Sequence, residues 1–371
     1  MRHAALVGYV ALTVWTVGCV SLGGLSAGEP SADGGAPTTG DADHTDGSAT
    51  ADGTSVDATL PDGTGTGGDA DSSAECPRAV CPTVLTAAVG PQRLALVDNA
   101  VYWTSSAAVG RVRLDGSSAT TTTLSAVTPP LARDVAVGTM GVPYVTVPTR
   151  GAAACAADLT TCGTGFIGSA GSASSVAVDA ANVYIGIFDD GAGAGAGALF
   201  RTGLDGSSPL VYANVNDAIL GLQVVAGTAF YRTSSAIRSV TSPSSLPMVV
   251  TAGQPLVAFV VQGNTLVVAT ATNELRVCTL AGTVCASPTS PVLVTTSAAS
   301  AMTADGTRVY WVEGGVAGSV RACDLPLCAN PTLLAEGQAF PSDIAVDALS
   351  IYWTNQGNAA GVGGAVMKLP K

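Results

Sequence analysis

The stretch that decides the fold is Val97-Asp98-Asn99-Ala100-Val101-Tyr102-Trp103-Thr104, an aspartate turn followed by an apolar, aromatic strand. The same pattern returns at Val178–Tyr184, Thr303–Trp311 and Val346–Thr354. The tyrosines of the four copies are separated by two, three and one multiples of a period of about 42 residues, which indicates an internal repeat. These tyrosines are Tyr102, Tyr184, Tyr310 and Tyr352.

Three further repeats lack the full pattern but have a strand-like segment at the expected position. Pro143–Val145, Ala229–Tyr231 and Leu266–Val268 stand where the missing copies should be. The chain therefore contains seven repeats, and we expect them to start near residues 94, 134, 174, 219, 255, 299 and 341.

Each repeat predicts four short strands. In the first repeat these are Leu94–Val97, Val101–Ser105, Gly110–Leu114 and Thr120–Leu124. Asp115-Gly116 between the last two is a strong hairpin signal. Four strands in 40 to 45 residues are typical of a propeller blade, so we expect an all-β chain that forms a seven-bladed β-propeller of four-stranded blades over residues 76–371.

The two ends of this domain predict a closed ring. The last repeat stops at Val366–Leu369, its third strand. Pro82–Thr86 matches Pro331–Ala335, the fourth strand of the sixth repeat. We therefore expect the N-terminal strand to complete the last blade, which would remove the exposed strand edges of an open array.

The first 19 residues have the features of an export signal. Met1-Arg2-His3 is a positive start, and Ala4–Val17 is an apolar run of signal-peptide length. Thr16–Cys19 resembles a bacterial lipobox, with Cys19 as the lipid attachment site, and Val20 after it implies sorting to the outer membrane. The alternative is an ordinary secretory signal that is cleaved nearby.

Residues 20–75 carry most of the net charge of −12. They contain no Lys or Arg and are rich in Gly, Ser, Thr and Asp, which predicts a disordered acidic linker. Asp41–Gly47 departs from the spacing of a calcium loop, so solvation is the expected role and calcium association the alternative. The acidic residues are Glu29, Asp33, Asp41, Asp43, Asp46, Asp52, Asp57, Asp62, Asp69, Asp71 and Glu75.

The aromatic strands carry a resemblance to a known family. Tyr102–Ser105, Tyr310–Glu313 and Tyr352–Asn355 resemble the motif of YWTD and NHL-type propellers, although its Asp is replaced in all three. The chain also looks like bacterial lipoproteins that pair such a propeller with a low-complexity leader. We expect the Tyr-Trp pairs to pack between blades.

Apart from Cys19, the cysteines form close pairs at one position of the repeat, beside the turn between the third and fourth strands. We expect local disulfides, which imply an oxidising compartment. Zinc binding, the alternative, requires other spacings, and residues 76–371 contain no His. The expected pairs are Cys76 with Cys81, Cys155 with Cys162, Cys278 with Cys285, and Cys323 with Cys328.

The scarcity of histidine limits the chemistry. The chain has only His3 and His44, so the propeller cannot use a Ser-His-Asp or Cys-His mechanism, and we predict no catalytic residue. Asp134 and Asp343 start first strands and are expected to bond nearby backbone amides. The acidic residues without such a pattern are candidates for a site, with solvated loop residues as the alternative: Asp189, Asp190, Asp217, Glu274 and Glu313.

Taken together, these features predict a non-catalytic binding or scaffold module displayed on the bacterial envelope by a lipid anchor. Its partner would be a protein or a glycan, and no basic stripe points to nucleic acid. We expect an exported outer-membrane lipoprotein that is monomeric, faces the periplasm or the surface, touches the membrane only through its lipid and has no cofactor. The alternatives are a calcium-dependent propeller hydrolase or lyase of the lactonase type and a structural envelope protein.

Overall fold

The structure is a computed structural model that describes residues 81–371 except 107, 125–131, 139, 148–150, 164–171, 190–196, 216, 254, 287–289, 296 and 359. The predicted signal segment, Cys19, the acidic linker and Cys76 lie outside the described residues. Among the described residues, no helix could cross a membrane.

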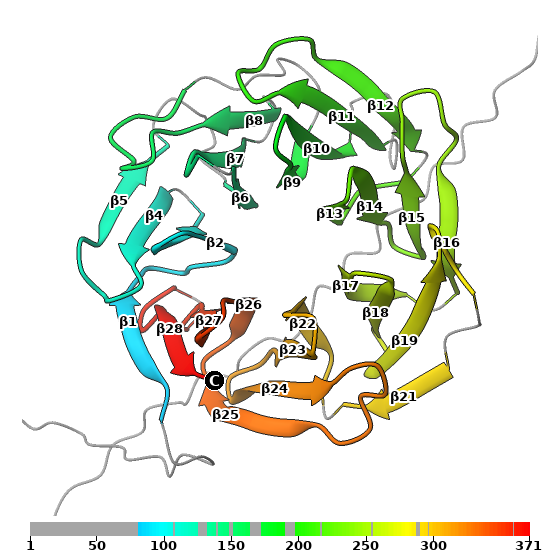
Figure 1. Cartoon of the computed structure of the whole chain (residues 1–371). Coiled ribbons are helices and arrows are strands. Elements are labelled where there is room, and N and C mark those ends of the chain that lie inside the picture. Colours follow the sequence, from blue (N-terminus) through cyan, green and yellow to red (C-terminus); the bar gives the residue numbers. More distant parts are fainter. Residues whose placement is uncertain are drawn as a thin grey trace, which may run out of the picture. The chain divides into compact units, whose positions relative to one another are not determined.

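The described chain forms seven antiparallel sheets, which stand as blades around a central channel (Figure 1). Blade 1 contains β2 (Leu94–Val97), β3 (Ala100–Thr104), β4 (Ala108–Arg113) and β5 (Thr120–Thr123). Blade 2 contains β6 (Val135–Val137), β7 (Pro143–Val147) and β8 (Gly151–Ala154). Blade 3 contains β9 (Ser172–Val178), β10 (Asn182–Asp189), β11 (Gly197–Gly203) and β12 (Leu210–Val215). Blade 4 contains β13 (Gly221–Val225), β14 (Thr228–Arg232), β15 (Ala236–Val240) and β16 (Met248–Ala252).

The remaining blades complete the ring. Blade 5 contains β17 (Leu256–Gln262), β18 (Thr265–Thr270), β19 (Glu274–Ala281) and β21 (Ser290–Val294), with the short β20 (Val284–Cys285) beside β19. Blade 6 contains β22 (Ala299–Ala304), β23 (Arg308–Glu313), β24 (Gly318–Asp324) and β25 (Thr332–Gln338). Blade 7 contains β26 (Pro341–Val346), β27 (Ser350–Asn355), β28 (Ala365–Pro370) and β1 (Thr83–Ala87). The seven-bladed prediction and its repeat starts are confirmed; three strands are described in blade 2, where residues 164–171 are not described.

The ring closes as the sequence predicts. β1 pairs antiparallel with β28, from Thr83 opposite Lys368 to Ala87 opposite Ala365. The N-terminal strand of the described chain is therefore the outer strand of the last blade (Figure 1). This arrangement ties the two ends of the domain together through backbone hydrogen bonds and leaves no open end in the ring.

Apolar side chains fill the spaces between neighbouring blades. Trp103 of blade 1 packs in one buried cluster with Tyr352 of blade 7, and Tyr310 of blade 6 packs in another with Trp353 of blade 7. All four side chains are buried. The expectation that the Tyr-Trp pairs pack between blades is therefore confirmed. Each buried ring removes a large apolar area from water, which stabilises the contact between neighbouring blades.

The repeated aspartate turn is a structural device. The hydroxyl of Tyr184 donates to Asp179 Oδ2 at 3.0 Å, while Asp179 Oδ1 accepts the backbone amides of Ala181 and Asn182. The same tyrosine-to-aspartate bond joins Tyr310 to Asp305 at 2.9 Å, and Tyr352 to Asp347 at 3.0 Å. These carboxylates thus hold the turn and the aromatic strand together.

The first copy of the turn differs. Asp98 stands four residues before Tyr102, whereas Asp179 stands five residues before its tyrosine. In this shorter turn Asp98 has a φ of 44°, and Tyr102 donates instead to the carbonyl of Ala157 in the next blade, at 2.6 Å. The copy with the shorter turn therefore has a tyrosine hydrogen bond between blades, whereas the three longer copies have one within the blade.

Within the described residues, local disulfides join Cys155 to Cys162, Cys278 to Cys285 and Cys323 to Cys328. Each lies at or just after the third strand of its blade, as the repeat predicts. Cys81 is also disulfide-bonded. Disulfides persist in oxidising compartments, which supports an exported protein.

Candidate functional site

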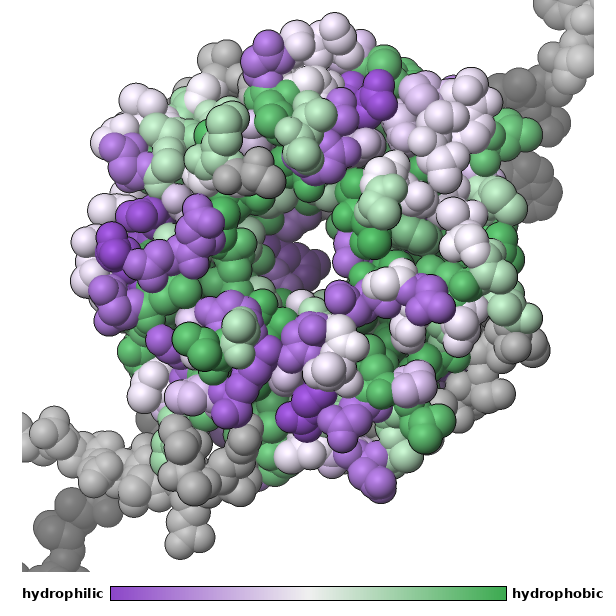
Figure 2. Space-filling view, viewed as in Figure 1, coloured by the Kyte–Doolittle hydropathy of each residue, from purple (hydrophilic) through white to green (hydrophobic). Residues whose placement is uncertain are grey.

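A cavity of about 370 Å³ occupies the central channel. Figure 2 shows the ring open at its centre. The cavity is lined mainly by the innermost strands of the blades, β2, β9, β13, β17, β22 and β26. A central channel surrounded by blades is a common place for ligands to bind, because strands from many blades contribute side chains to one space.

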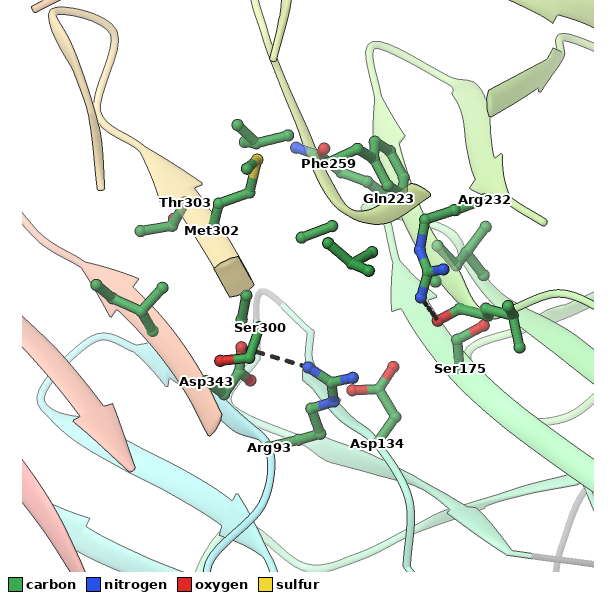
Figure 3. A pocket seen from close by; sticks show the side chains of 18 of the residues that line it. Arg93, Asp134, Ser175, Gln223, Arg232, Phe259, Ser300, Met302, Thr303 and Asp343 are labelled. Carbon is green, nitrogen blue, oxygen red and sulfur yellow. Dashed lines mark hydrogen bonds and ion pairs between the residues drawn. The ribbon is translucent and has the colours of Figure 1, made fainter. Parts of the chain in front are cut away.

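The charged lining residues gather at one end of this channel. Arg93 and Asp134 stand directly before β2 and β6, and Asp343 is the third residue of β26. Arg232, at the end of β14, pairs with Gly221, the first residue of β13. All four therefore lie where the innermost strands begin, and we call them the polar end of the channel. In Figure 3 Arg93 lies between Asp134 and Asp343.

Apolar and amide side chains line the cavity further along the innermost strands. Phe259 of β17 and Met302 of β22 are half-buried, as is Gln223 of β13. In the view of Figure 3 they lie across the cavity from Arg93. The Gln223 amide bridges two blades, because it donates to the carbonyl of Val261 at 2.9 Å and accepts from its amide at 2.8 Å. The cavity thus combines a charged end with an apolar wall.

The two aspartates of the polar end also join neighbouring blades. Asp134 Oδ2 accepts the backbone amide of Val176 in blade 3 at 2.9 Å, and its Oδ1 accepts the amide of Val135 at 2.9 Å. Asp343 Oδ2 accepts the amide of Leu94 in blade 1 at 2.8 Å. The expected bonds to nearby amides are present, and both carboxylates are held rigidly at the cavity wall.

Burial disfavours the charged form of both acids. It raises the pKa of Asp134 to about 7; the positive charge of Arg93 opposes this shift, and the negative charge of Asp343 adds to it. Burial also raises the pKa of Asp343, again against the effect of Arg93. The charged form of Asp134 is therefore less favoured than that of an exposed aspartate.

The two arginines differ in their partners of opposite charge, since Arg93 has a carboxylate on either side and Arg232 has no ion pair in the described structure. Arg93 Nη1 lies 3.8 Å from Asp343 Oδ1, and its side chain is 38% exposed. Arg232 donates to two carbonyls, from Nη1 to Leu256 at 2.7 Å and from Nη2 to Leu220 at 3.0 Å. No carboxylate in the described part of the chain forms an ion pair with Arg232. Burial and the nearby charge of Arg93 lower the pKa of Arg232 to about 10.

Of the acidic residues that the sequence singled out, the three with described side chains, Asp217, Glu274 and Glu313, do not line this cavity. Asp217 accepts hydrogen bonds from Ser234 at 3.0 Å and from the Ala218 amide at 2.8 Å. Glu274 forms an ion pair with Arg276 at 2.7 Å. Asp189 ends β10, its side chain is not described, and Asp190 lies outside the described residues.

Glu313 occupies a buried polar cluster. Its side chain is only 2% exposed and accepts from Trp311 Nε1 at 3.2 Å, Ser319 Oγ at 2.8 Å and Arg321 Nε at 3.1 Å. Glu313 is therefore not a solvated loop residue, and like Asp217 and Glu274 it is not part of the cavity lining.

Arg93 and Arg232 were not among the site residues predicted from the sequence. Arg232 could have been noticed, because it stands where the aromatic strands of other repeats carry Thr104, Thr146 and Thr354. Each of these threonines accepts an amide hydrogen bond from the start of an innermost strand. An arginine at that position reaches further, toward the channel.

The described residues contain no group of three or more His, Cys, Asp or Glu that could hold a metal ion. The carboxylates among the cavity-lining residues are Asp134 and Asp343. A calcium site usually takes six to eight oxygen ligands, so these two groups supply only part of such a shell.

No family model and no curated protein matches the sequence. The chain is similar to solved propeller structures. The RRP9 WD40 repeats share 11% identity over 80% of this chain and 99% of that chain, with a TM-score of 0.64. The structure of U3-55K shares 11% identity over 78% and 98%, with a TM-score of 0.63. A chain in a nidogen/laminin complex shares 19% identity over 54% and 80%, with a TM-score of 0.46.

At these identities, the likeness to RRP9 and U3-55K shows the fold alone. The propeller fold supports a binding or scaffold module, because a rigid ring of blades holds side chains from many strands in fixed positions around one cavity.

Proposed function

We propose that this protein is a non-catalytic binding module, displayed on the bacterial envelope by a lipid on Cys19 and holding its ligand at the polar end of the channel. The observation that carries the proposal is the cavity itself, where Arg93 and Arg232 share one end with Asp134 and Asp343. The acidic segment 20–75 would act as the spacer between membrane and propeller.

Both aspartates are structural acceptors in the ring. Each accepts at least one backbone amide from a neighbouring blade, so each is fixed in place at the cavity wall. Residues 76–371 also contain no histidine. The groups of the polar end are therefore suited to recognising a ligand by charge and hydrogen bonding.

The sequence and the disulfides support display on the envelope. The disulfides favour an oxidising compartment. The export signal ends in Thr16–Cys19, which resembles a lipobox. The two features are independent of each other, and both are consistent with an exported lipoprotein.

The test is expression of the full chain in a Gram-negative host, with membrane fractionation and intact mass. We expect the wild type in the membrane fraction with the mass of an acylated Cys19. Cys19→Ser should move the protein to the soluble periplasmic fraction. Ser21→Ala, two residues further on, should behave as the wild type. A wild-type protein without acyl mass in the soluble fraction would contradict the proposed display.

A further inference from the structure

We propose that the polar end of the channel binds a uronate, the carboxylated and hydroxyl-rich unit of an acidic glycan. The inference rests on the proposed binding function and names the ligand class of that site. It follows from the chemistry of four side chains and from the size of the cavity.

The first step is the state of Arg232. A guanidinium has five N–H donors, and two of its bonds in the structure go to the neutral carbonyls of Leu256 and Leu220. Its side chain is half-buried, yet no described carboxylate pairs with it. A half-buried cation without an anionic partner favours an anionic ligand.

The second step is Arg93, at the same end of the cavity. Its ion pair with Asp343, at 3.8 Å, is longer than a hydrogen bond, so the guanidinium donors remain available. The charge of Arg93 is close enough to lower the pKa of Arg232. A carboxylate between the two guanidiniums would relieve this repulsion and accept paired, charge-assisted hydrogen bonds.

The third step is the pair of acids that flank Arg93. Asp134 accepts two backbone amides and Asp343 accepts one from Leu94, which leaves lone pairs on both carboxylates. A simple anion would meet only repulsion from them. A ligand that carries hydroxyl donors next to its carboxylate would instead hydrogen-bond to both acids.

A small zwitterion, such as an amino acid, would also present an anion and donors. The two acids stand on either side of Arg93, and each already accepts a backbone amide, so two separate hydroxyl donors suit them better than one ammonium group. Binding of an amino acid is therefore tested directly against binding of the uronate.

The rest of the cavity fits a sugar ring. Its volume of about 370 Å³ is at the small end of ligand pockets. Half-buried Phe259 and Met302 offer an apolar wall for the C–H face of a ring.

The experiment is isothermal titration calorimetry on the full chain, with sodium glucuronate, glucose and alanine as separate titrants. We expect glucuronate to bind, and glucose and alanine to bind at least about tenfold more weakly. Arg93→Gln should weaken glucuronate binding about tenfold or more, the loss expected for a charge-assisted hydrogen bond. Arg232→Gln should do the same, with circular dichroism to confirm its fold.

Arg113→Gln is the matched control, because Arg113 is 43% exposed and its ion pair with Asp115 has a distance of 3.9 Å, outside the cavity. It should bind glucuronate as the wild type does. The inference is overturned if no titrant binds, if glucose or alanine binds as tightly as glucuronate, or if Arg93→Gln behaves like Arg113→Gln. None of these results bears on the proposed lipid attachment at Cys19, which membrane fractionation tests separately.

Discussion

Asp343 accepts a hydrogen bond of 2.8 Å from the backbone amide of Leu94, and this bond joins the last blade of the ring to the first. The same acid lies 3.8 Å from Arg93, so one side chain contributes both to closure and to the polar end of the channel. Ring stability and the binding site are therefore coupled at this residue.

Replacing Asp343 should cost more than replacing an exposed aspartate. Asp343→Ala leaves the amide of Leu94 without its acceptor, and we expect the free energy of unfolding to fall by about 2 kcal/mol. Asp115→Ala removes an exposed turn acceptor for Ser117 and an exposed ion pair with Arg113, and should cost clearly less than Asp343→Ala. Urea denaturation measures both, and equal losses would show that the inter-blade bond contributes nothing.

The titration of Asp134 predicts a pH dependence of stability. Its folded-state pKa of about 7 lies above the unfolded value of about 4, so the unfolded chain loses this proton first as the pH rises. The free energy of unfolding should therefore decrease between pH 4 and pH 7, by an amount on the order of 2 kcal/mol. Asp343, whose pKa is also raised, contributes with the same sign.

Asp134→Asn isolates this contribution. Relative to the variant, the wild type should lose stability as the pH rises from 4 to 7 and change little above 7.5, as followed by thermal unfolding. The control is Asp115→Asn, since hydrogen bonds from Ser117 lower the pKa of Asp115 and move its titration below this window. A constant difference between wild type and Asp134→Asn across the window would contradict the raised pKa.

Much of the architecture can be predicted from the sequence. The aspartate turn, the aromatic strand and the cysteine positions recur with a period, and a periodic signal survives local variation. The closing strand could also be found, because Pro82–Thr86 matches a fourth strand elsewhere in the chain.

The candidate site was harder to predict. Arg93 and Asp343 are far apart in the sequence and meet only because the ring closes. Arg232 stands where other repeats carry Thr, and an alignment of repeats identifies shared residues rather than exceptions. Glu313 was a site candidate with a solvated loop residue as the alternative, because its partners Ser319 and Arg321 stand on the next strand. Contacts across the ring and across strands are not visible in a local pattern.

Replacing the buried Glu313 should lower the free energy of unfolding more than replacing the partly buried Glu274. Glu313→Ala removes an acceptor from Trp311, Ser319 and Arg321, and we expect a loss of about 3 kcal/mol. Glu274→Ala breaks a pair with Arg276 whose side chains are about a quarter exposed, and should cost less than about 1 kcal/mol. Chemical denaturation of the two variants measures both losses. A larger loss in the free energy of unfolding for Glu274→Ala would contradict this ranking.

The fourth disulfide can be located by peptide mapping. Cys81 is disulfide-bonded, and the repeat predicts Cys76 as its partner. Proteolysis without reduction, followed by mass spectrometry, should yield a linked Cys76–Cys81 peptide together with three other local bridges. Finding Cys81 linked to any other cysteine would refute the predicted pairing.

Calcium should have little effect on the propeller. The cavity lining supplies two carboxylates, and both already accept backbone amides, so we expect calcium chloride or EDTA to shift the melting temperature by less than about 1 °C. A stabilisation of several degrees by millimolar calcium would favour the calcium-dependent alternative.

The most direct measurement of the central claim is a crystal structure of the protein grown with sodium glucuronate. The account predicts one glucuronate in the central channel, with its carboxylate between Arg93 and Arg232 and its hydroxyl groups bonded to Asp134 and Asp343. A polar end that holds only water, with glucuronate absent or bound elsewhere on the ring, would contradict it.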